Sequence, residues 1–361
     1  MIRLLLIILL TSQFSTALSK TVNNSVKIDV LYSESADIFD LMDNVSNWWP
    51  GFTEVEYSKF WHKKFGIKKE DKLLFKKYTA IRQKYYHDPD QKPKSPLKNR
   101  NGFFSTLGSV NADPIAEAFY SSNSMQQGLK KLAQIINKKE LQFFKKFYVH
   151  FKPNYSSLIS KSPEQYSVAI NKVRASLNKP GISEYFNNIS QFYNIKSPLS
   201  YRVIYTWWPP LNRTNASPTG KYLVMRYNPS KHGYLDDSDI VAHEIIHSIS
   251  AQQKFKQKAE LTNKFLNKCK VNGLLKRYEI LEEPLAVVFG QLIFNKKFEP
   301  KKFSLSSNLY RNMWVSSFAR QIYLPLQKRF ESGEKITDGF IEDASLICNE
   351  FHMAANQLNS N

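Results

Sequence analysis

The spacing of hydrophobic residues changes near residue 200. Before that point, apolar side chains recur every three or four positions in several segments, which is the spacing of a helix with one buried face. One short alternation, Val26 to Val30, instead predicts a strand near the start of the chain. Residues 20–195 are therefore expected to form a mainly helical region, with helices predicted over 34–48, 72–86, 125–136, 140–150 and 163–177.

Two segments beyond residue 200 are rich in β-branched and aromatic residues, Tyr201 to Trp207 and Tyr222 to Tyr227. A run of prolines and polar residues separates them, and we expect them to pair as strands of a small antiparallel sheet. Helices are predicted again from Asp239, over 274–295 and over 308–331. The expected fold class is therefore α+β and mostly α, with 196–361 as the second region.

The helix predicted from Asp239 contains the sequence His243-Glu244-Ile245-Ile246-His247. Residues four apart lie one above the other on a helix, so both imidazoles can reach a single ion. The chain has seven histidines, and the probability that this H-E-x-x-H motif arises by chance is below about 1%. We interpret His243 and His247 as metal ligands.

Zn²⁺ suits two imidazoles and a carboxylate, and it lowers the pKa of a coordinated water to near neutrality. Glu244 projects beside the histidines and is expected to take the proton of that water as the catalytic base. A third ligand must come from elsewhere in the chain. Residues 248–258 contain neither histidine nor glycine, which excludes a nearby third histidine, but Glu282 and Glu283 begin an apolar helical stretch downstream.

These residues resemble the gluzincins, zinc peptidases that pair H-E-x-x-H with a glutamate from a later helix. Glu283-Pro284-Leu285-Ala286 is similar to their E-G-x-A pattern, with proline in place of glycine. The resemblance implies a zincin-like fold, in which the small sheet packs on the H-E-x-x-H helix. It also implies Glu283 as third ligand, with Glu282 in reserve, and Tyr222 to Tyr227 as the strand that binds substrate backbone. The order of elements also resembles an uncharacterised family of secreted bacterial proteins regarded as metallopeptidases.

Peptide hydrolysis needs a donor that stabilises the oxyanion of the tetrahedral intermediate. Tyr310, Tyr323 and His352 all lie downstream of the motif and could serve, and the sequence does not rank them.

The first residues have the layout of a signal peptide. Arg3 precedes the short apolar run Leu4 to Leu10, and small or polar residues follow as far as Ser19. The apolar run is too short to cross a bilayer, so we expect 1–19 to be removed and the mature chain, without a transmembrane segment, to be secreted or periplasmic. In an oxidising compartment the only two cysteines, Cys269 and Cys348, either pair or remain buried thiols.

The formal net charge is +20, which favours anionic partners such as envelope polymers. The lysines are spread along the chain and no nucleic-acid motif is present, so no specific nucleic-acid binding is expected. The sequence thus predicts an exported zinc metallopeptidase acting on protein or peptide substrates. The alternative is a non-catalytic zincin-fold module that binds at an anionic cell envelope.

Overall fold

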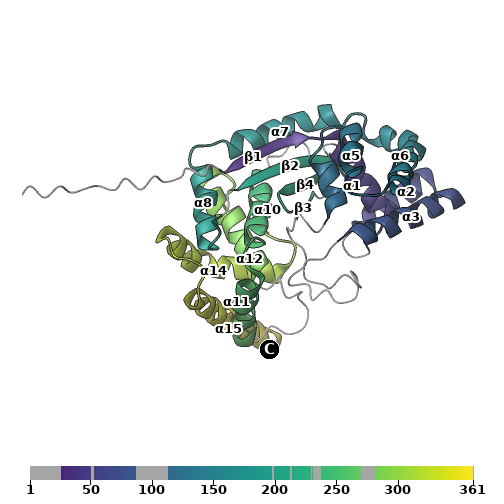
Figure 1. Ribbon diagram of the computed structural model, residues 1–361. Coiled ribbons are helices and arrows are strands. Elements are labelled where there is room, and N and C mark those ends of the chain that lie inside the picture. Colours follow the sequence, from purple (N-terminus) through teal and green to yellow (C-terminus); the bar gives the residue numbers. More distant parts are fainter. Residues whose placement is uncertain are drawn as a thin grey trace, which may run out of the picture.

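The computed structural model describes residues 26–49, 53–86, 113–196, 199–211, 214–228, 230, 237–269 and 281–360. The signal peptide expected at 1–19 lies outside these residues. The described part is mostly helical and contains one four-stranded sheet, which agrees with the expected α+β class (Figure 1).

The sheet is mixed, with strand order β1-β2-β4-β3. Its strands are β1 Lys27–Tyr32, β2 Ser200–Trp207, β3 Asn215–Thr219 and β4 Tyr222–Tyr227. β1 pairs with β2 in parallel, with Val30 opposite Val203. β2 pairs with β4 in parallel, with Val203 opposite Leu223. β3 runs antiparallel to β4 and is the edge strand on that side.

The predicted antiparallel pairing of Tyr201–Trp207 with Tyr222–Tyr227 is wrong, because these strands lie side by side in parallel. The chain leaves β2, forms β3 on the far side of β4 and returns through a tight turn into β4. Every residue of β4 is buried. Such continuous burial is typical of parallel strands covered on both faces, and a near-continuous apolar run was its signal in the sequence.

Helices cover both faces of the sheet, and alternate residues of β4 point to different cores. Tyr222 and Val224 face a core made with the N-terminal helices α1 to α6. Leu223, Met225 and Tyr227 face a second core, which contains α7, α8, α10 and the C-terminal helices. The N-terminal helices of the first core are α1 Glu34–Ser46, α2 Val55–Phe65, α3 Lys69–Tyr85, α4 Pro114–Tyr120, α5 Met125–Leu132 and α6 Lys138–Ile159.

The helices of the second core include α10, which carries the H-E-x-x-H motif, and the helices packed around it. Among them are α7 Ser162–Leu177, α8 Ile182–Phe192, α10 Ser238–Ser250, α12 Glu282–Val287, α13 Phe294–Phe298 and α14 Met313–Glu331. A π-helix, η3 Val288–Ile293, joins α12 to α13. The helix predicted over 274–295 is thus seen from Glu282 onward, and its first residues lie outside the described part.

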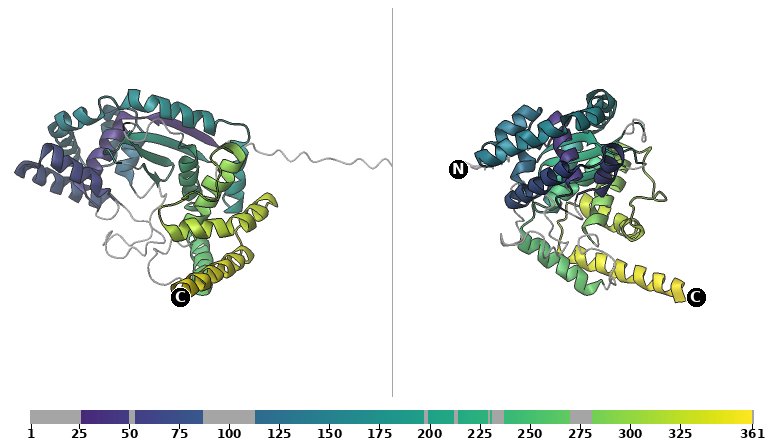
Figure 2. Two further views of the ribbon diagram at one scale, coloured as in Figure 1. Left: turned by 180° about the vertical axis from the view of Figure 1, so that it is seen from behind. Right: turned by 90° about the vertical axis from the view of Figure 1, so that its right-hand side faces the viewer.

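Two helices at the C-terminal end lie side by side, α11 Phe255–Lys268 and α15 Asp338–Ser360 (Figure 2). Cys269 follows α11 directly, Cys348 lies within α15, and a disulfide joins them with their Cα atoms 5.7 Å apart. Both cysteines are buried. The two cysteines, whose state the sequence left open, therefore fix one helix to the other.

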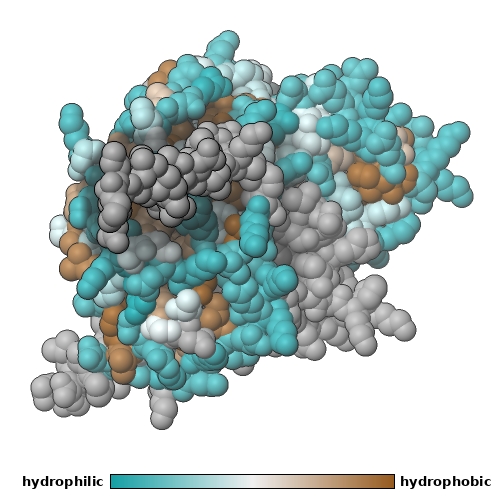
Figure 3. All heavy atoms as spheres, turned by 60° about the vertical axis from the view of Figure 1, so that its left-hand side comes forward, coloured by the Kyte–Doolittle hydropathy of each residue, from teal (hydrophilic) through white to brown (hydrophobic). Residues whose placement is uncertain are grey.

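The surface of the molecule is mainly hydrophilic on the face drawn in Figure 3, where apolar residues form separate small patches. Within the described residues, no helix combines the length and the apolar character needed to span a bilayer.

Candidate metal centre

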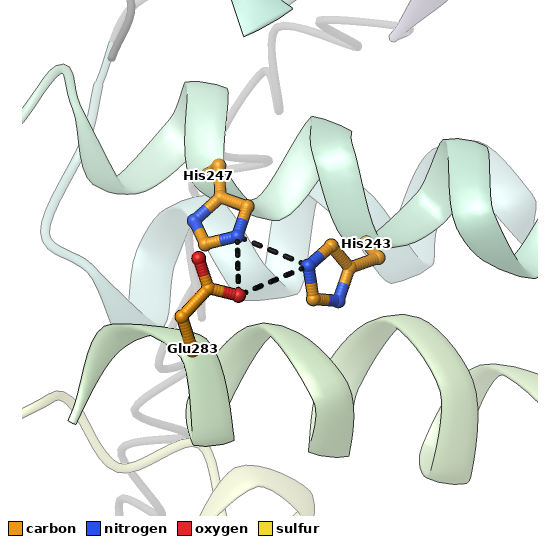
Figure 4. A group of neighbouring side chains, drawn as sticks. All are labelled: His243, His247 and Glu283. Atoms are coloured by element: carbon orange, nitrogen blue, oxygen red, sulfur yellow. Dashed lines mark hydrogen bonds and ion pairs between the residues drawn. The ribbon is translucent and has the colours of Figure 1, made fainter. Parts of the chain in front are cut away.

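The helix α10 carries the H-E-x-x-H motif and is buried from Val241 to Ser250. Five apolar residues are at most 1% exposed and anchor it in the core beside the sheet: Val241, Ala242, Ile245, Ile246 and Ile249. His243 and His247 lie one helical turn apart and both point toward α12 (Figure 4). The sequence thus builds the site on a rigid, packed helix.

Glu283, on the first turn of α12, meets the two histidines. The Nε2 atoms of His243 and His247 are 3.1 Å apart. Oε2 of Glu283 lies 3.4 Å from Nε2 of His243 and 3.3 Å from Nε2 of His247. All three side chains are buried, and the cluster could hold a metal ion.

The spacing of these three atoms fits a small metal ion. Ligands bound tetrahedrally at about 2.0–2.1 Å lie about 3.3 Å from one another, close to the separations observed here. Oε2 of Glu283 is buried and accepts no hydrogen bond, although two imidazole nitrogens face it. The three converging atoms, two imidazole nitrogens and one carboxylate oxygen, all carry electron pairs that point toward the same place. A cation bound between them would accept these electron pairs.

Glu282, considered in the sequence as the reserve ligand, contacts the opposite side of His247. Its Oε1 lies 3.3 Å from Nδ1 of His247. An ionised carboxylate can only accept, so Nδ1 carries the proton and the Nε2 lone pair is left for the metal. The two adjacent carboxylates therefore have different roles. Glu283 faces the metal position, and Glu282 orients the ligand His247. The sequence signal for these roles was the acidic pair itself.

The charges at the site are strongly coupled. Burial alone would lower the pKa of His247, but Glu283, Glu282 and Glu244 outweigh it and raise that pKa well above its usual value. Burial would likewise raise the pKa of Glu283, yet His247 and His243 hold it well below its usual range. In the metal-free protein, a proton on His247 would thus stand in for a cation, and metal binding must displace it.

Glu244 is buried beside the ligands. Burial raises the pKa of its carboxyl group, and the positive charge on His243 and His247 only partly offsets this effect. A carboxylate with a raised pKa is a better proton acceptor near neutral pH than an exposed glutamate. Its position and its basicity both suit a general base.

Of the three candidate oxyanion donors, Tyr310 is the one that the structure places against a ligand. Its ring stacks on that of His243, with centroids 6.0 Å apart and planes 23° apart. Tyr323 is buried in α14, where its ring packs against Phe303. His352 lies in α15, and its side chain is outside the described residues.

The π-helix η3 packs against the backbone of His243, a contact that the sequence did not predict. A Cβ atom on Gly290 would lie 2.4 Å from Cα of His243, so only glycine allows this approach. The hydroxyl of Tyr185 donates to the carbonyl oxygen of Phe289 in the same segment. π-Helical turns often occur at functional sites. The available signal was a lone glycine in an apolar helical run, which does not reveal its partner.

The strand expected to bind substrate backbone cannot do so, because β4 is paired on both sides, with β2 and with β3. Among the described strands, the outermost one on this side of the sheet is β3, which packs against α10. The candidate peptide-binding strand is therefore Asn215–Thr219 and not Tyr222–Tyr227.

Comparison of the chain with protein-family models, with curated proteins and with solved structures finds no match. The geometry of the site is therefore the basis on which a function can be proposed.

Proposed function

We propose that the protein is a zinc-dependent metallopeptidase that acts outside the cytoplasm. The observation that carries the proposal is the convergence of His243, His247 and Glu283 on one point, with the buried carboxyl group of Glu244 beside them. A purely structural metal site gains nothing from a carboxylate of raised pKa next to its ligands. An H-E-x-x-H helix with a downstream glutamate is the ligand set of a hydrolytic zinc site.

Zinc is the proposed metal because two imidazoles and a single carboxylate are borderline ligands. Mg²⁺ and Ca²⁺ prefer all-oxygen sites with more ligands. A zinc ion bound here would polarise the scissile carbonyl and lower the pKa of a coordinated water to near neutrality.

Residues of the chain would then supply proton transfer, oxyanion stabilisation and substrate alignment. Glu244 takes a proton from the attacking water and delivers it to the leaving amine. Tyr310, stacked on His243, is the proposed donor of a hydrogen bond to the oxyanion. The edge strand β3 can align an extended peptide through backbone hydrogen bonds. Pro218 lies within β3 and lacks an N–H group, so the donors come from its other residues.

Action outside the cytoplasm is supported by two features. The leader-like N-terminus has the layout of an export signal. The Cys269–Cys348 disulfide is of a kind that persists in oxidising compartments. The net charge of +20 supports substrates or surroundings that are anionic.

The test compares the chain lacking residues 1–19 with its Glu244→Gln variant. Both are loaded with zinc, their metal content is measured, and cleavage of a denatured protein mixture is followed by mass spectrometry. We expect both proteins to bind about one zinc per chain. We expect cleavage by Glu244→Gln to be about 10²- to 10⁴-fold slower.

Equal cleavage by the two proteins would remove Glu244 from the mechanism. Zinc binding without any cleavage by the wild type would favour the alternative, a non-catalytic module at an anionic envelope. Absence of zinc binding would contradict both the metal assignment and the peptidase.

A further inference from the structure

Lys258 lies on the outer side of the metal centre, on the helix α11. Its Nζ is 2.6 Å from Oε2 of Glu282. The other oxygen of the same carboxylate, Oε1, faces Nδ1 of His247 at 3.3 Å. A continuous chain of polar contacts therefore runs from α11 through α12 to Nδ1 of His247, whose other ring nitrogen, Nε2, faces the metal position.

We propose that Lys258 is a positioning residue for His247, and that the Cys269–Cys348 disulfide keeps it in place by fixing α11. The proposal rests on the metal centre of the proposed function. In addition, α11, which contributes no metal ligand, would influence the affinity of the centre for its metal ion. Loss of the disulfide would then weaken metal binding.

The Lys258–Glu282 pair is well shielded from solvent. The side chains of Lys258 and Glu282 are 15% and 7% exposed. Removing one partner of such a pair leaves the other charge uncompensated, which a buried site does not tolerate. Without Lys258, the carboxylate of Glu282 loses the cation that holds its Oε2 and would turn toward water. That movement removes the acceptor that holds the Nδ1 proton of His247 and directs its Nε2 lone pair to the metal.

Two kinds of contact hold α11, the helix that carries Lys258. Leu261 and Phe265 are buried in the core that also contains α10. At its C-terminal end the disulfide joins Cys269 to α15, and the side-chain amide of Asn349 donates to the carbonyl oxygen of Lys268 at 2.8 Å. The disulfide is thus the covalent link between α15 and the helix that bears the lysine.

The affinity of the metal-free chain for Zn²⁺ and for Co²⁺ tests the proposal, measured by competition with a chromogenic chelator. Lys258→Met removes the charge and keeps most of the side-chain length. Lys258→Arg keeps the charge. Lys256→Met is the matched control, because Lys256 is an exposed lysine two residues away on the same helix. Circular dichroism and thermal melting of the metal-free proteins establish that each variant is folded.

We expect Lys258→Met to bind metal about 10- to 100-fold more weakly than the wild type. Lys258→Arg should lose less, and Lys256→Met should match the wild type. The visible spectrum of Co²⁺ should change in Lys258→Met, since a reoriented imidazole alters the ligand geometry. If Lys258→Met does not fold, Lys258→Gln replaces it, because the amide removes the charge while its polar end group tolerates partial exposure.

The disulfide is tested with the paired substitution Cys269→Ser and Cys348→Ser. Affinity should fall by about 2- to 30-fold. The same substitutions should have little further effect in the Lys258→Met background, since contacting members of one network are not additive.

Wild-type affinity in a folded neutral variant of Lys258 would overturn the proposal and leave the proposed function intact. Undiminished affinity in the chain without the disulfide would overturn the role given to Cys269–Cys348. A wild-type chain that binds no metal would overturn both this inference and the proposed function.

Discussion

Two buried clusters of charged residues lie on opposite sides of the sheet, and they are built in opposite ways. On the side of α1, Arg82 binds Asp43 and Asp113 together, with four contacts of 2.6–3.2 Å. On the side of α10, Glu283 and two histidines face one another with no hydrogen bond to Oε2 of Glu283. One cluster matches donors with acceptors, whereas the other gathers electron-pair donors around one point.

The Arg82 cluster has the features of a structural site. The indole N–H of Trp48 and the hydroxyl of Tyr78 also donate to Asp43. Burial alone would lower the pKa of Arg82, but Asp113 and Asp43 outweigh it and raise that pKa well above its usual value. Every charge in this cluster has its partner within the chain. Burial and charge alone therefore do not mark a functional site, whereas an unmatched set of ligand atoms does.

The largest expected effect comes from breaking the matched cluster. Arg82→Met removes the only cation that the structure places between Asp43 and Asp113 in its described part, and leaves two buried carboxyl groups uncompensated. We expect the free energy of unfolding to fall by about 3–5 kcal/mol, as measured by urea denaturation of the metal-free chain. The affinity of the remaining folded protein for zinc should not change, because no ligand contacts this cluster. A loss of zinc affinity equal to that of a ligand variant would show that the two clusters are coupled.

A smaller effect is expected at Asp37, which shares α1 with Asp43 but forms no ion pair in the described part of the structure. Burial raises the pKa of its carboxyl group to about 7. A raised carboxyl pKa means that the folded state binds the proton more tightly than the unfolded state does. Stability from this group is therefore complete below about pH 4 and is lost as the pH rises through about 7.

The variant Asp37→Asn keeps an acceptor for the backbone N–H of Trp207 and removes the ionisation. We expect it to be more stable than the wild type by roughly 4 kcal/mol at pH 8 and by less than half of that at pH 5. Chemical denaturation of both proteins at the two pH values measures this. A difference that is the same at both pH values would show that Asp37 does not titrate in this range.

The sequence placed α1, α3, α5 and α7 within a few residues, because amphipathic spacing and local turn residues define them, but it gave no bounds for α2, α4 and α8. It did not predict the parallel register of β2 and β4. Which strand pairs with which depends on contacts between residues far apart in the sequence, and local patterns do not determine it. Pro218 also made Asn215–Thr219 hard to identify as a strand. The length of α6, which continues through Pro153, was also missed.

For the site, the spacing in His243-Glu244-Ile245-Ile246-His247 was sufficient, because a single helix sets the positions of both histidines. The resemblance to gluzincins supplied Glu283. The role of Glu282 and the contact of Gly290 with His243 could not be predicted, since they depend on how α10, α12 and η3 pack in three dimensions. Lys258, the partner of Glu282, is one of many lysines in the chain. No feature of the neighbouring sequence distinguishes it from the others.

The most direct test of the central claim is the X-ray absorption spectrum of the zinc-loaded chain at the zinc edge. We expect two imidazole nitrogens at about 2.0–2.1 Å and oxygen ligands at about 2.0–2.2 Å, with the imidazole contribution halved in the His247→Ala variant. A shell made only of oxygen atoms, or a spectrum that the substitution leaves unchanged, would show that zinc is bound elsewhere and would contradict the assignment of His243, His247 and Glu283.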